Sequence, residues 1–146
     1  MTIYFYTRTD EYGDFCNFSS HGFELDGKYW RTVEHYFQAQ KFAGTEQEET
    51  VRRARTPADA KKLGRRPSPP LRNDWEEVKN EVMRKAVSRK FQTHPELRQR
   101  LLDTGEEELV ERSPSDSYWG CGSDGAGKNK LGKILMSVRS ELRASA

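Results

Sequence analysis

The sequence predicts an α+β fold in which a single domain, covering residues 1–146, is dominated by helices and carries a small antiparallel sheet. A length of 146 residues suits one domain and is too short for two independent cores. Helical periodicity fills most of the chain, whereas segments rich in β-branched and aromatic residues are few and short. The mean hydropathy is −0.99, yet 7 Phe, 6 Tyr and 3 Trp supply enough large side chains to build a core.

Short segments near both ends of the chain are expected to form the sheet. Ile3–Tyr6 is β-branched and aromatic, and Leu109–Glu111 is a further candidate strand. Between Phe23–Leu25 and Lys28–Trp30 stands the dipeptide Asp26-Gly27, which favours the type I′ turn of a two-residue hairpin. We therefore expect an antiparallel hairpin at this turn.

Helices are expected from residue 33 onward, because a threonine that can cap a helix precedes each of three segments. The first cap is Thr32, the second is Thr45 in a Thr-x-x-Glu capping box, and the third is Thr56 before a first-turn proline. The predicted helices run from Val33 to about Ala43, from Thr45 onward, and from Pro57 to about Gly64.

The prolines of residues 65–70 interrupt the helical pattern, because proline lacks the backbone donor and restricts the residue before it. We expect a fixed loop there. The longest helix is predicted from Asn73 to about Gln92, and a shorter one follows, ending near Gly105. A glycine-rich stretch, Gly120–Gly132, then leads into a last amphipathic helix.

Composition excludes several classes of protein. No apolar run approaches the roughly 18 residues of a membrane span, and the first residues lack the features of a signal peptide, so we expect a cytoplasmic protein. The net charge of +2 does not by itself indicate nucleic acid or an anionic membrane as a partner. Cys16 and Cys121 fit no disulfide framework. No metal or cofactor is expected, since His21, His35 and His94 lack metal-ligand spacing.

One predicted helix carries polar residues that point to chemistry. At about 100° per residue, Glu34, Gln38 and Lys41 fall within about 60° of one another around the helix axis and form a polar stripe. Phe37 and Phe42 border this stripe.

The spacing alone leaves two interpretations of the stripe open. It is either a solvated helix face with an ordinary i,i+4 contact, or the wall of a pocket. The bordering aromatic residues favour a pocket. So does Gln40, whose amide falls on the core-facing side of the helix and needs a buried partner.

Longer motifs surround this helix. Three of them, Tyr12–Ser19, Asp26–Trp30 and Thr32–Phe42, resemble the signature of the YbiA-like family, also called the NADAR superfamily. Further matches in family order extend almost to the C-terminus and include rare aromatic pairs. They are Leu63–Arg65, Leu71–Trp75, Lys79–Met83, Lys90-Phe91, Leu101–Thr104, Tyr118–Gly120 and Gly127–Gly132.

The resemblance implies an N-glycosidase. Activities in the family are removal of ADP-ribose from guanine bases and cleavage of a ribosylaminopyrimidine phosphate of riboflavin biosynthesis. Both substrates join ribose C1 to an exocyclic amino nitrogen of a guanine-type ring. The implied partner is ADP-ribosylated guanine in DNA or a nucleotide-like small molecule, with no membrane and no obligate protein partner. A noncatalytic ADP-ribose or nucleotide-binding module is the alternative of another class.

Glu34 and Lys41 are the predicted catalytic residues. The amine of Lys41 can attack C1 of an opened ribosylamine and form a Schiff base, while Glu34 shuttles protons. In a competing mechanism Glu34 activates water or stabilises an oxocarbenium-like centre, and Lys41 only neutralises charge. Because a neighbouring carboxylate favours the ammonium form of Lys41, the Schiff-base mechanism requires burial or a second cation as an offset.

The predicted substrate-binding residues lie in several parts of the chain. Trp75 can stack on a base or pack in the core, and Asn17 can bond a ribose or close a turn. Arg65 is the cation chosen to meet a phosphate, from a segment between residues 52 and 72 that holds eight Lys and Arg. The full set is Asn17, Phe18, Phe37, Gln38, Arg65, Trp75, Trp119, Gly120, Asp124 and Asn129.

The glycine-rich stretch is expected to complete the active cleft with the first long helix and the proline loop. It nearly spells a P-loop, but Asn129 replaces the metal-binding Ser or Thr, which argues against an ATPase. Its glycines and the following helix N-terminus are expected to approach an anion or the ribose. The family commonly has an acidic residue after Trp-Gly, where this chain has Cys121, and Asp124 is the candidate substitute.

Overall fold

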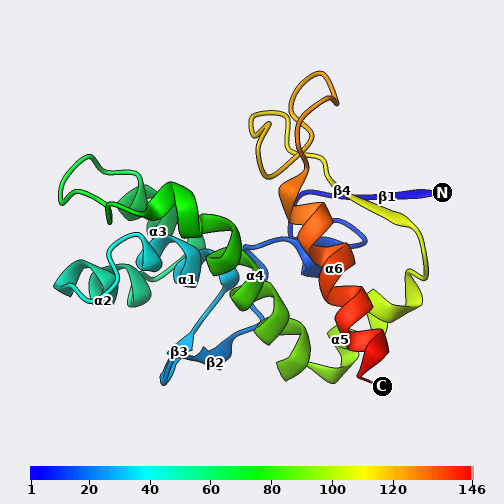
Figure 1. The fold of residues 1–146 in the computed structure, drawn as a ribbon, viewed down its shortest axis with the longest axis horizontal. Coiled ribbons are helices and arrows are strands. Elements are labelled where there is room, and N and C mark those ends of the chain that lie inside the picture. The colour runs from blue at the N-terminus through cyan, green and yellow to red at the C-terminus, as the bar shows by residue number, and fades with distance from the viewer. Residues whose placement is uncertain (146) are drawn as a thin grey trace. The chain divides into compact units, whose positions relative to one another are not determined.

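The computed structural model describes residues 1–145 and confirms the helix-rich α+β prediction, with six α-helices and four short strands among them. The described chain forms two compact units (Figure 1). One unit combines residues 1–19 with residues 91–145, and the other is Ser20–Lys90. The prediction that residues 1–146 form a single domain stays a prediction.

In the unit Ser20–Lys90 the predicted hairpin is confirmed. Strands β2 (Phe23–Leu25) and β3 (Lys28–Trp30) pair antiparallel. Asp26 and Gly27 connect them with φ of 55° and 77°, the left-handed values that a type I′ turn requires of both central residues.

Helices α1 (Val33–Gln40), α2 (Glu46–Arg52) and α3 (Pro57–Gly64) lie together in this unit, and α4 (Trp75–Thr93) begins in it (Figure 1). Two threonine caps are confirmed, since Thr32 accepts a hydrogen bond from the His35 amide and Thr56 accepts one from the Asp59 amide. Helix α1 ends earlier than predicted. Lys41 is its C-terminal cap, still in helical conformation.

The predicted capping box at the start of α2 is wrong in its contacts. The Thr45 hydroxyl donates to the Phe42 carbonyl and leaves the α2 amides uncapped. Glu48 reaches backward instead, and its carboxylate accepts hydrogen bonds from the Gly44 amide and from Gln40 Nε2, at 2.9 and 3.1 Å. Glu48 is therefore the partner that the core-side amide of Gln40 requires.

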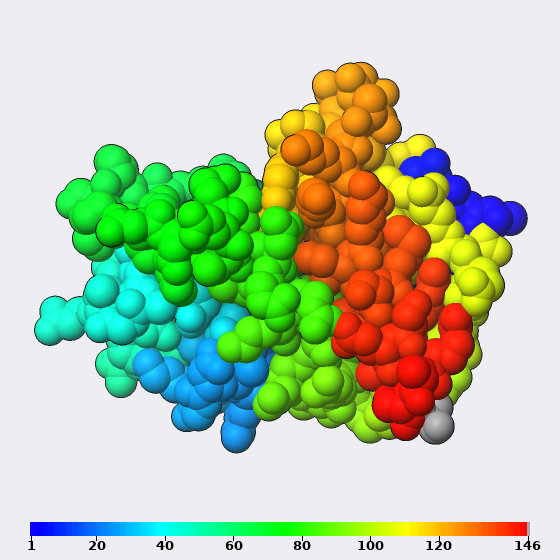
Figure 2. Space-filling view, in the orientation of Figure 1, coloured from blue at the N-terminus to red at the C-terminus, as the bar shows by residue number. Residues whose placement is uncertain are grey.

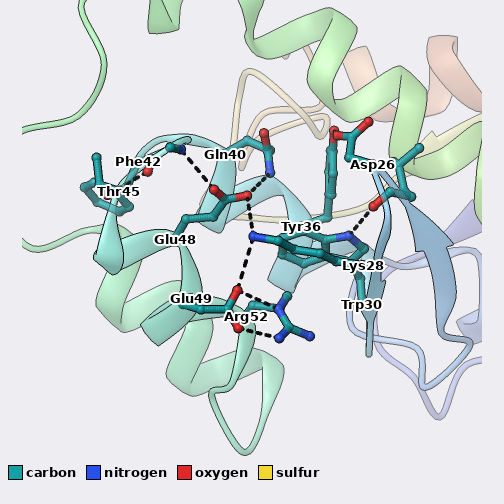
Figure 3. Close-up of polar contacts among 12 residues, drawn as sticks. Asp26, Lys28, Trp30, Tyr36, Gln40, Phe42, Thr45, Glu48, Glu49 and Arg52 are labelled. Atoms are coloured by element: carbon teal, nitrogen blue, oxygen red, sulfur yellow. Dashed lines mark hydrogen bonds and ion pairs between the residues drawn. The ribbon is translucent and has the colours of Figure 1, made fainter.

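A second group of contacts fixes α1 from the same side (Figure 3). Tyr36 donates to Asp26 at 2.7 Å, and its ring meets Trp30 edge to face at 5.0 Å. Glu49 of α2 pairs with both Lys28 of the hairpin and Arg52. These pairs lower the pKa of Glu49 to about 2. Helix α1 is thus held against the hairpin and α2 by its core-facing side, which leaves the polar stripe for other contacts.

In the other unit, β1 (Thr2–Phe5) and β4 (Glu108–Glu111) form a parallel pair. The sheet predicted as antiparallel is therefore two separate two-stranded ladders, and only the hairpin is antiparallel. Parallel strands are joined by a long crossover, and about a hundred residues separate β1 from β4. Turn motifs in the sequence therefore could not predict this pairing. Short helix η1 (Gly13–Phe15), α5 (Pro95–Asp103) and α6 (Lys130–Ala144) complete this unit.

The core of this unit is aromatic. Phe15 lies at its centre, with the Phe5 ring at 6.1 Å and the Phe91 ring at 5.7 Å, both in edge-on geometry. None of the helices within residues 1–145 is long and apolar enough to cross a membrane.

Candidate active site

The polar stripe of α1 is buried. Every residue of α1 is buried, with side chains that include Glu34 at 7% exposure and Gln38 at 4%. The interpretation of the stripe as a solvated face is therefore wrong. A buried carboxyl group in an eight-residue helix demands partners or a proton.

Within residues 1–145, Glu34 has one hydrogen-bond partner, Gln38, whose Nε2 donates to Glu34 Oε2 at 2.6 Å. Burial raises the pKa of the Glu34 carboxyl well above its ordinary range. The Gln38 hydrogen bond and the positive charges of Lys61, Lys41 and Arg65 oppose that rise without cancelling it. Glu34 is accordingly a carboxyl group that can hold a proton under conditions where an exposed glutamate is ionised.

Lys41 is half-buried at the end of the same stripe. Its Nζ donates to the Gly64 carbonyl at 3.2 Å and lies 5.9 Å from the ring centroids of both Phe37 and Trp75. Phe37 and Trp75 are buried and meet edge to face at 5.1 Å. Of the two aromatic residues predicted to border the stripe, Phe37 lies beside Lys41 and is joined there by Trp75 of α4, whereas the bordering role of Phe42 stays a prediction.

Burial lowers the pKa of the Lys41 ammonium group, and the positive charges of Arg65 and Lys79 lower it further. Glu34 acts in the opposite direction, as expected of a nearby carboxylate, but does not reverse the shift. Both offsets that a nucleophilic Lys41 requires, burial and a second cation, are thus present at the site.

Gly64, the last residue of α3, brings the stripe together. Its carbonyl accepts the Lys41 hydrogen bond, and a Cβ added to it would overlap Oε1 of Gln38. The proline loop returns to the same place, because the Arg72 amide donates to the Lys41 carbonyl at 2.8 Å. The Arg72 guanidinium pairs with Asp74 at 2.6 Å, just before α4 begins.

Seven of the eight cations of residues 52–72, all but Lys61, divide into two groups. Arg52 and Arg53 pair with Glu49, and Arg72 pairs with Asp74. The end of α3 and the proline loop, drawn in green, lie on the surface of their unit (Figure 2). The exposed cations there form no ion pair within residues 1–145. They are Arg55, Lys62, Arg65 and Arg66.

In the other unit, four consecutive backbone amides at the end of the glycine loop are hydrogen-bonded. The amides of residues 128–131 donate to the carbonyls of Ser117, Gly120, Tyr118 and Trp119. These four amides are therefore already engaged, while the expected approach of the loop glycines and the N-terminus of α6 to an anion or the ribose stays a prediction.

Asn129 and Gly120, two predicted binding residues of this loop, have structural tasks. Asn129 is buried with φ of 51°, and its amide side chain accepts from the Glu111 amide and donates to the Leu109 carbonyl at 3.0 and 2.9 Å. Gly120 is buried where a side chain would press on the Glu111 and Asp116 carbonyls. Their roles in substrate binding stay predictions.

The remaining predicted residues of this unit are at least partly accessible. Asn17 and Phe18 are half-buried, and Trp119 is half-buried with its ring 4.9 Å from Tyr118. Asp124 is exposed, and its Oδ1 accepts from the Ala126 amide at 2.9 Å. Their binding roles, and the completion of the cleft by this loop, also stay predictions.

Sequence reasoning missed three contributors to the site, namely Gly64, Lys61 and Lys79. Gly64 and Lys79 were recognised as members of the motifs Leu63–Arg65 and Lys79–Met83, and Lys61 as one of the clustered cations, but none was assigned to the site. Within residues 1–145 no group of three or more His, Cys, Asp or Glu side chains is placed to hold a metal ion.

Comparisons with known proteins agree with the resemblance. The model of the NADAR domain matches residues 4–143. An N-glycosidase of Nostoc punctiforme is 53% identical over 98% of this chain and 94% of its own length. A riboflavin biosynthesis protein of Vibrio vulnificus is 43% identical over 99% of this chain and 39% of its own length. The NMR structure of Escherichia coli YbiA superposes with a TM-score of 0.91 at 49% identity, covering 99% of this chain and 86% of that one. With the family model spanning nearly all of its residues, the chain belongs to the NADAR family.

Proposed function

We propose that the protein is an N-glycosidase that hydrolyses the bond between ribose C1 and an exocyclic amino nitrogen of a guanine-type ring. One observation carries the proposal: a buried Glu34 and a half-buried Lys41 share one stripe, and burial favours the uncharged form of each. A protonated carboxyl can act as an acid, and an uncharged amine can act as a nucleophile. Several relatives are named N-glycosidases, which supports the same reaction class.

The proposed reaction begins when Glu34 protonates the ribose ring oxygen, so that the ring opens and C1 forms an imine with the base nitrogen. The lone pair of Lys41 Nζ then attacks C1. The attacking Nζ gives up a proton to the base nitrogen, the bond from C1 to that nitrogen breaks, and the base leaves with its amino group restored. The resulting Schiff base between Nζ and C1 then adds water. Its hydrolysis restores the Lys41 amine and releases the sugar as an aldehyde, which closes again to the ring form.

The competing mechanism has no covalent step. In it Glu34 removes a proton from the attacking water, and Lys41 supplies only positive charge. Lys41→Arg separates the two mechanisms, because arginine keeps the charge but is not a nucleophile. The Schiff-base mechanism predicts a borohydride-trapped adduct on Lys41 and an inactive arginine variant. An active arginine variant, together with no trapped adduct in the unmodified protein, would favour the noncovalent mechanism.

Two substrates fit the proposed chemistry. ADP-ribosylated guanine in DNA is supported by the exposed cations of α3 and the proline loop, which are available to phosphate groups. The ribosylaminopyrimidine phosphate is supported by the printed name of the Vibrio vulnificus relative, a riboflavin biosynthesis protein. The second substrate needs only one phosphate contact, for which Arg65 is a candidate because its charge acts on both Glu34 and Lys41.

A chromatographic assay with both substrates in parallel tests the proposal and ranks the substrates. The double variant Lys62→Ala, Arg66→Ala then separates them. The double variant is expected to turn over ADP-ribosylated DNA more slowly and with a weaker dependence on salt concentration. Turnover of the ribosylaminopyrimidine phosphate should be unaffected. Release of neither base by the unmodified protein would contradict an N-glycosidase of this type.

A noncatalytic module that only binds ADP-ribose or a nucleotide is the remaining alternative. Binding by such a module would survive Glu34→Gln, and the unmodified protein would show no turnover. A matched measurement of ligand affinity and product release on the same samples therefore distinguishes a binding module from an enzyme.

A further inference from the structure

Only one end of the Gln38 amide is engaged in the structure. Its Nε2 donates to Glu34 Oε2 at 2.6 Å, whereas its buried Oε1 has no hydrogen-bond partner within residues 1–145. Buried amide oxygens without a partner are rare in folded proteins, because their desolvation is left uncompensated. The unsatisfied oxygen beside the candidate acid calls for an explanation in the site's chemistry.

The packing of α3 holds this amide in place. Gln38 is 4% exposed, and its Oε1 lies against Gly64, where an added Cβ would overlap it. Gly64 also accepts the Lys41 hydrogen bond at 3.2 Å. One glycine thus sets the position of the amide next to Glu34 and of the amine at the other end of the stripe.

We propose that Gln38 is a positioning residue that decides which oxygen of Glu34 carries the transferable proton. Because the Gln38 N–H occupies Oε2, the proton of the neutral carboxyl resides on Oε1, which has no hydrogen bond to any described residue. The proton is then available to a substrate. This inference rests on the proposed role of Glu34 as the acid.

The opposite orientation of the amide explains why an unsatisfied oxygen is tolerated. If the amide were rotated, Gln38 Oε1 would accept the proton of Glu34 and hold it in an internal hydrogen bond. The donor-first orientation keeps the proton free at the expense of one unpaired acceptor. Burial also raises the pKa of Glu34, which keeps that proton in place until substrate arrives.

Gln38→Met tests the proposal, because methionine has a similar length and no donor. The Gln38 hydrogen bond favours the carboxylate, so its loss is expected to raise the pKa of Glu34. Carbon-13 NMR of the Glu34 carboxyl measures this titration, and the Glu34→Gln variant assigns the signal. We expect kcat to fall at least about 10-fold with little change in KM. The melting temperature should change little, because removal of the unpaired Gln38 oxygen offsets the loss of the hydrogen bond to Glu34 Oε2.

Gln40→Met is the matched control, since Gln40 is buried on the same helix but bonds to Glu48 on its other side. It is expected to lower the melting temperature and leave the Glu34 titration unchanged. Gln38→Glu gives a second arm should the methionine variant not fold, because two adjacent carboxyls share one proton and titrate in two steps.

An unchanged Glu34 titration in Gln38→Met, or the same shift in Gln40→Met, would overturn the proposal. The titration needs no substrate, so its outcome is separate from that of the turnover assays. An enzyme inactive on both substrates would refute the proposed function, while the carboxyl titration would still decide the role of Gln38.

Discussion

The sequence predicts substrate binding in two polar regions, and they differ in how their polar groups are satisfied. In the glycine loop, the amides of residues 128–131 and both ends of the Asn129 side chain are hydrogen-bonded within the loop and to β4. On the α1 stripe, Gln38 Oε1 has no partner among the described residues, and the Lys41 amine has one carbonyl partner among them.

This difference separates a structural task from a chemical one. A polar group whose hydrogen bonds are already made stabilises the fold and has little left to offer a ligand. A buried group with unmet capacity is destabilising in isolation and is retained where chemistry uses it. We therefore expect substitutions on the stripe to change turnover and substitutions in the loop to change stability.

The largest effect is expected from Glu34→Gln. The amide keeps the size of the side chain but can neither donate the acid proton nor take it back, so kcat should fall by about 10²–10⁴-fold. Thermal unfolding should be little changed, because a neutral amide suits a buried position. Steady-state turnover beside a melting curve checks both statements, and an active variant would remove Glu34 from the chemistry.

Gly64→Ala should have the next largest effect on turnover. The new methyl group would displace the Gln38 amide, and the movement would reach Glu34 through their hydrogen bond. A displacement of about 1 Å can lower a rate by up to about 100-fold. Lys62→Ala, an exposed change on the same helix, is the control when the small phosphate is the substrate. Equal activity of the two variants would show that the contact with Gly64 is unimportant.

Asn129→Ala is expected to act on stability instead. It removes one buried and one part-buried hydrogen bond to β4 and places alanine at φ of 51°, so the free energy of unfolding should fall by about 2–3 kcal/mol. Urea denaturation measures this change. Asn129→Gly, which tolerates the backbone angle, should restore part of it. A variant of normal stability that binds substrate poorly would instead confirm the predicted binding role.

The sequence predicted those parts of the fold that local chemistry determines. Asp26-Gly27 predicted the hairpin, and Thr32 and Thr56 predicted the starts of α1 and α3. Periodicity also placed Glu34 and Lys41 on one stripe, because the 100° rotation per residue is a local property.

Contacts between distant segments escaped prediction. The parallel pairing of β1 with β4 depends on how the chain returns, which no turn motif encodes. Thr45 looked like a cap, but tertiary contact drew Glu48 to Gly44 and Gln40 instead. The role of Gly64 could not be read from its neighbours, because it follows from the approach of α3 to Gln38.

His35 extends the comparison to pH, as a fully satisfied group on the site helix itself. The Ala54 carbonyl can only accept, so Nε2 carries a hydrogen, and in the neutral ring the Thr32 hydroxyl donates to Nδ1. Burial lowers the pKa of His35, and the nearby Arg31 charge adds to that effect. The unfolded chain therefore binds a proton that the folded chain resists.

Stability is consequently expected to fall as the pH drops below about 6.5, the ordinary pKa of histidine. The slope attributable to one proton is at most about 1.4 kcal/mol per pH unit. Urea denaturation at pH 7 and pH 5 should show a smaller loss in His35→Gln than in the unmodified chain. Equal losses in both chains would assign the acid sensitivity to other groups.

The smallest effect is expected from Asp124→Asn, which tests the glycine loop for a catalytic acid. Asp124 is exposed, and its Oδ1 accepts one amide hydrogen from Ala126, a contact that asparagine can reproduce. Turnover should stay within about twofold of that of the unmodified chain, and the free energy of unfolding within about 0.5 kcal/mol. A 10-fold loss of kcat with unchanged stability would instead make this carboxylate the substitute for the acid that the family commonly has after Trp-Gly. The division between a structural loop and a chemical stripe would then fail, because an exposed group with a satisfied oxygen would be acting on the substrate.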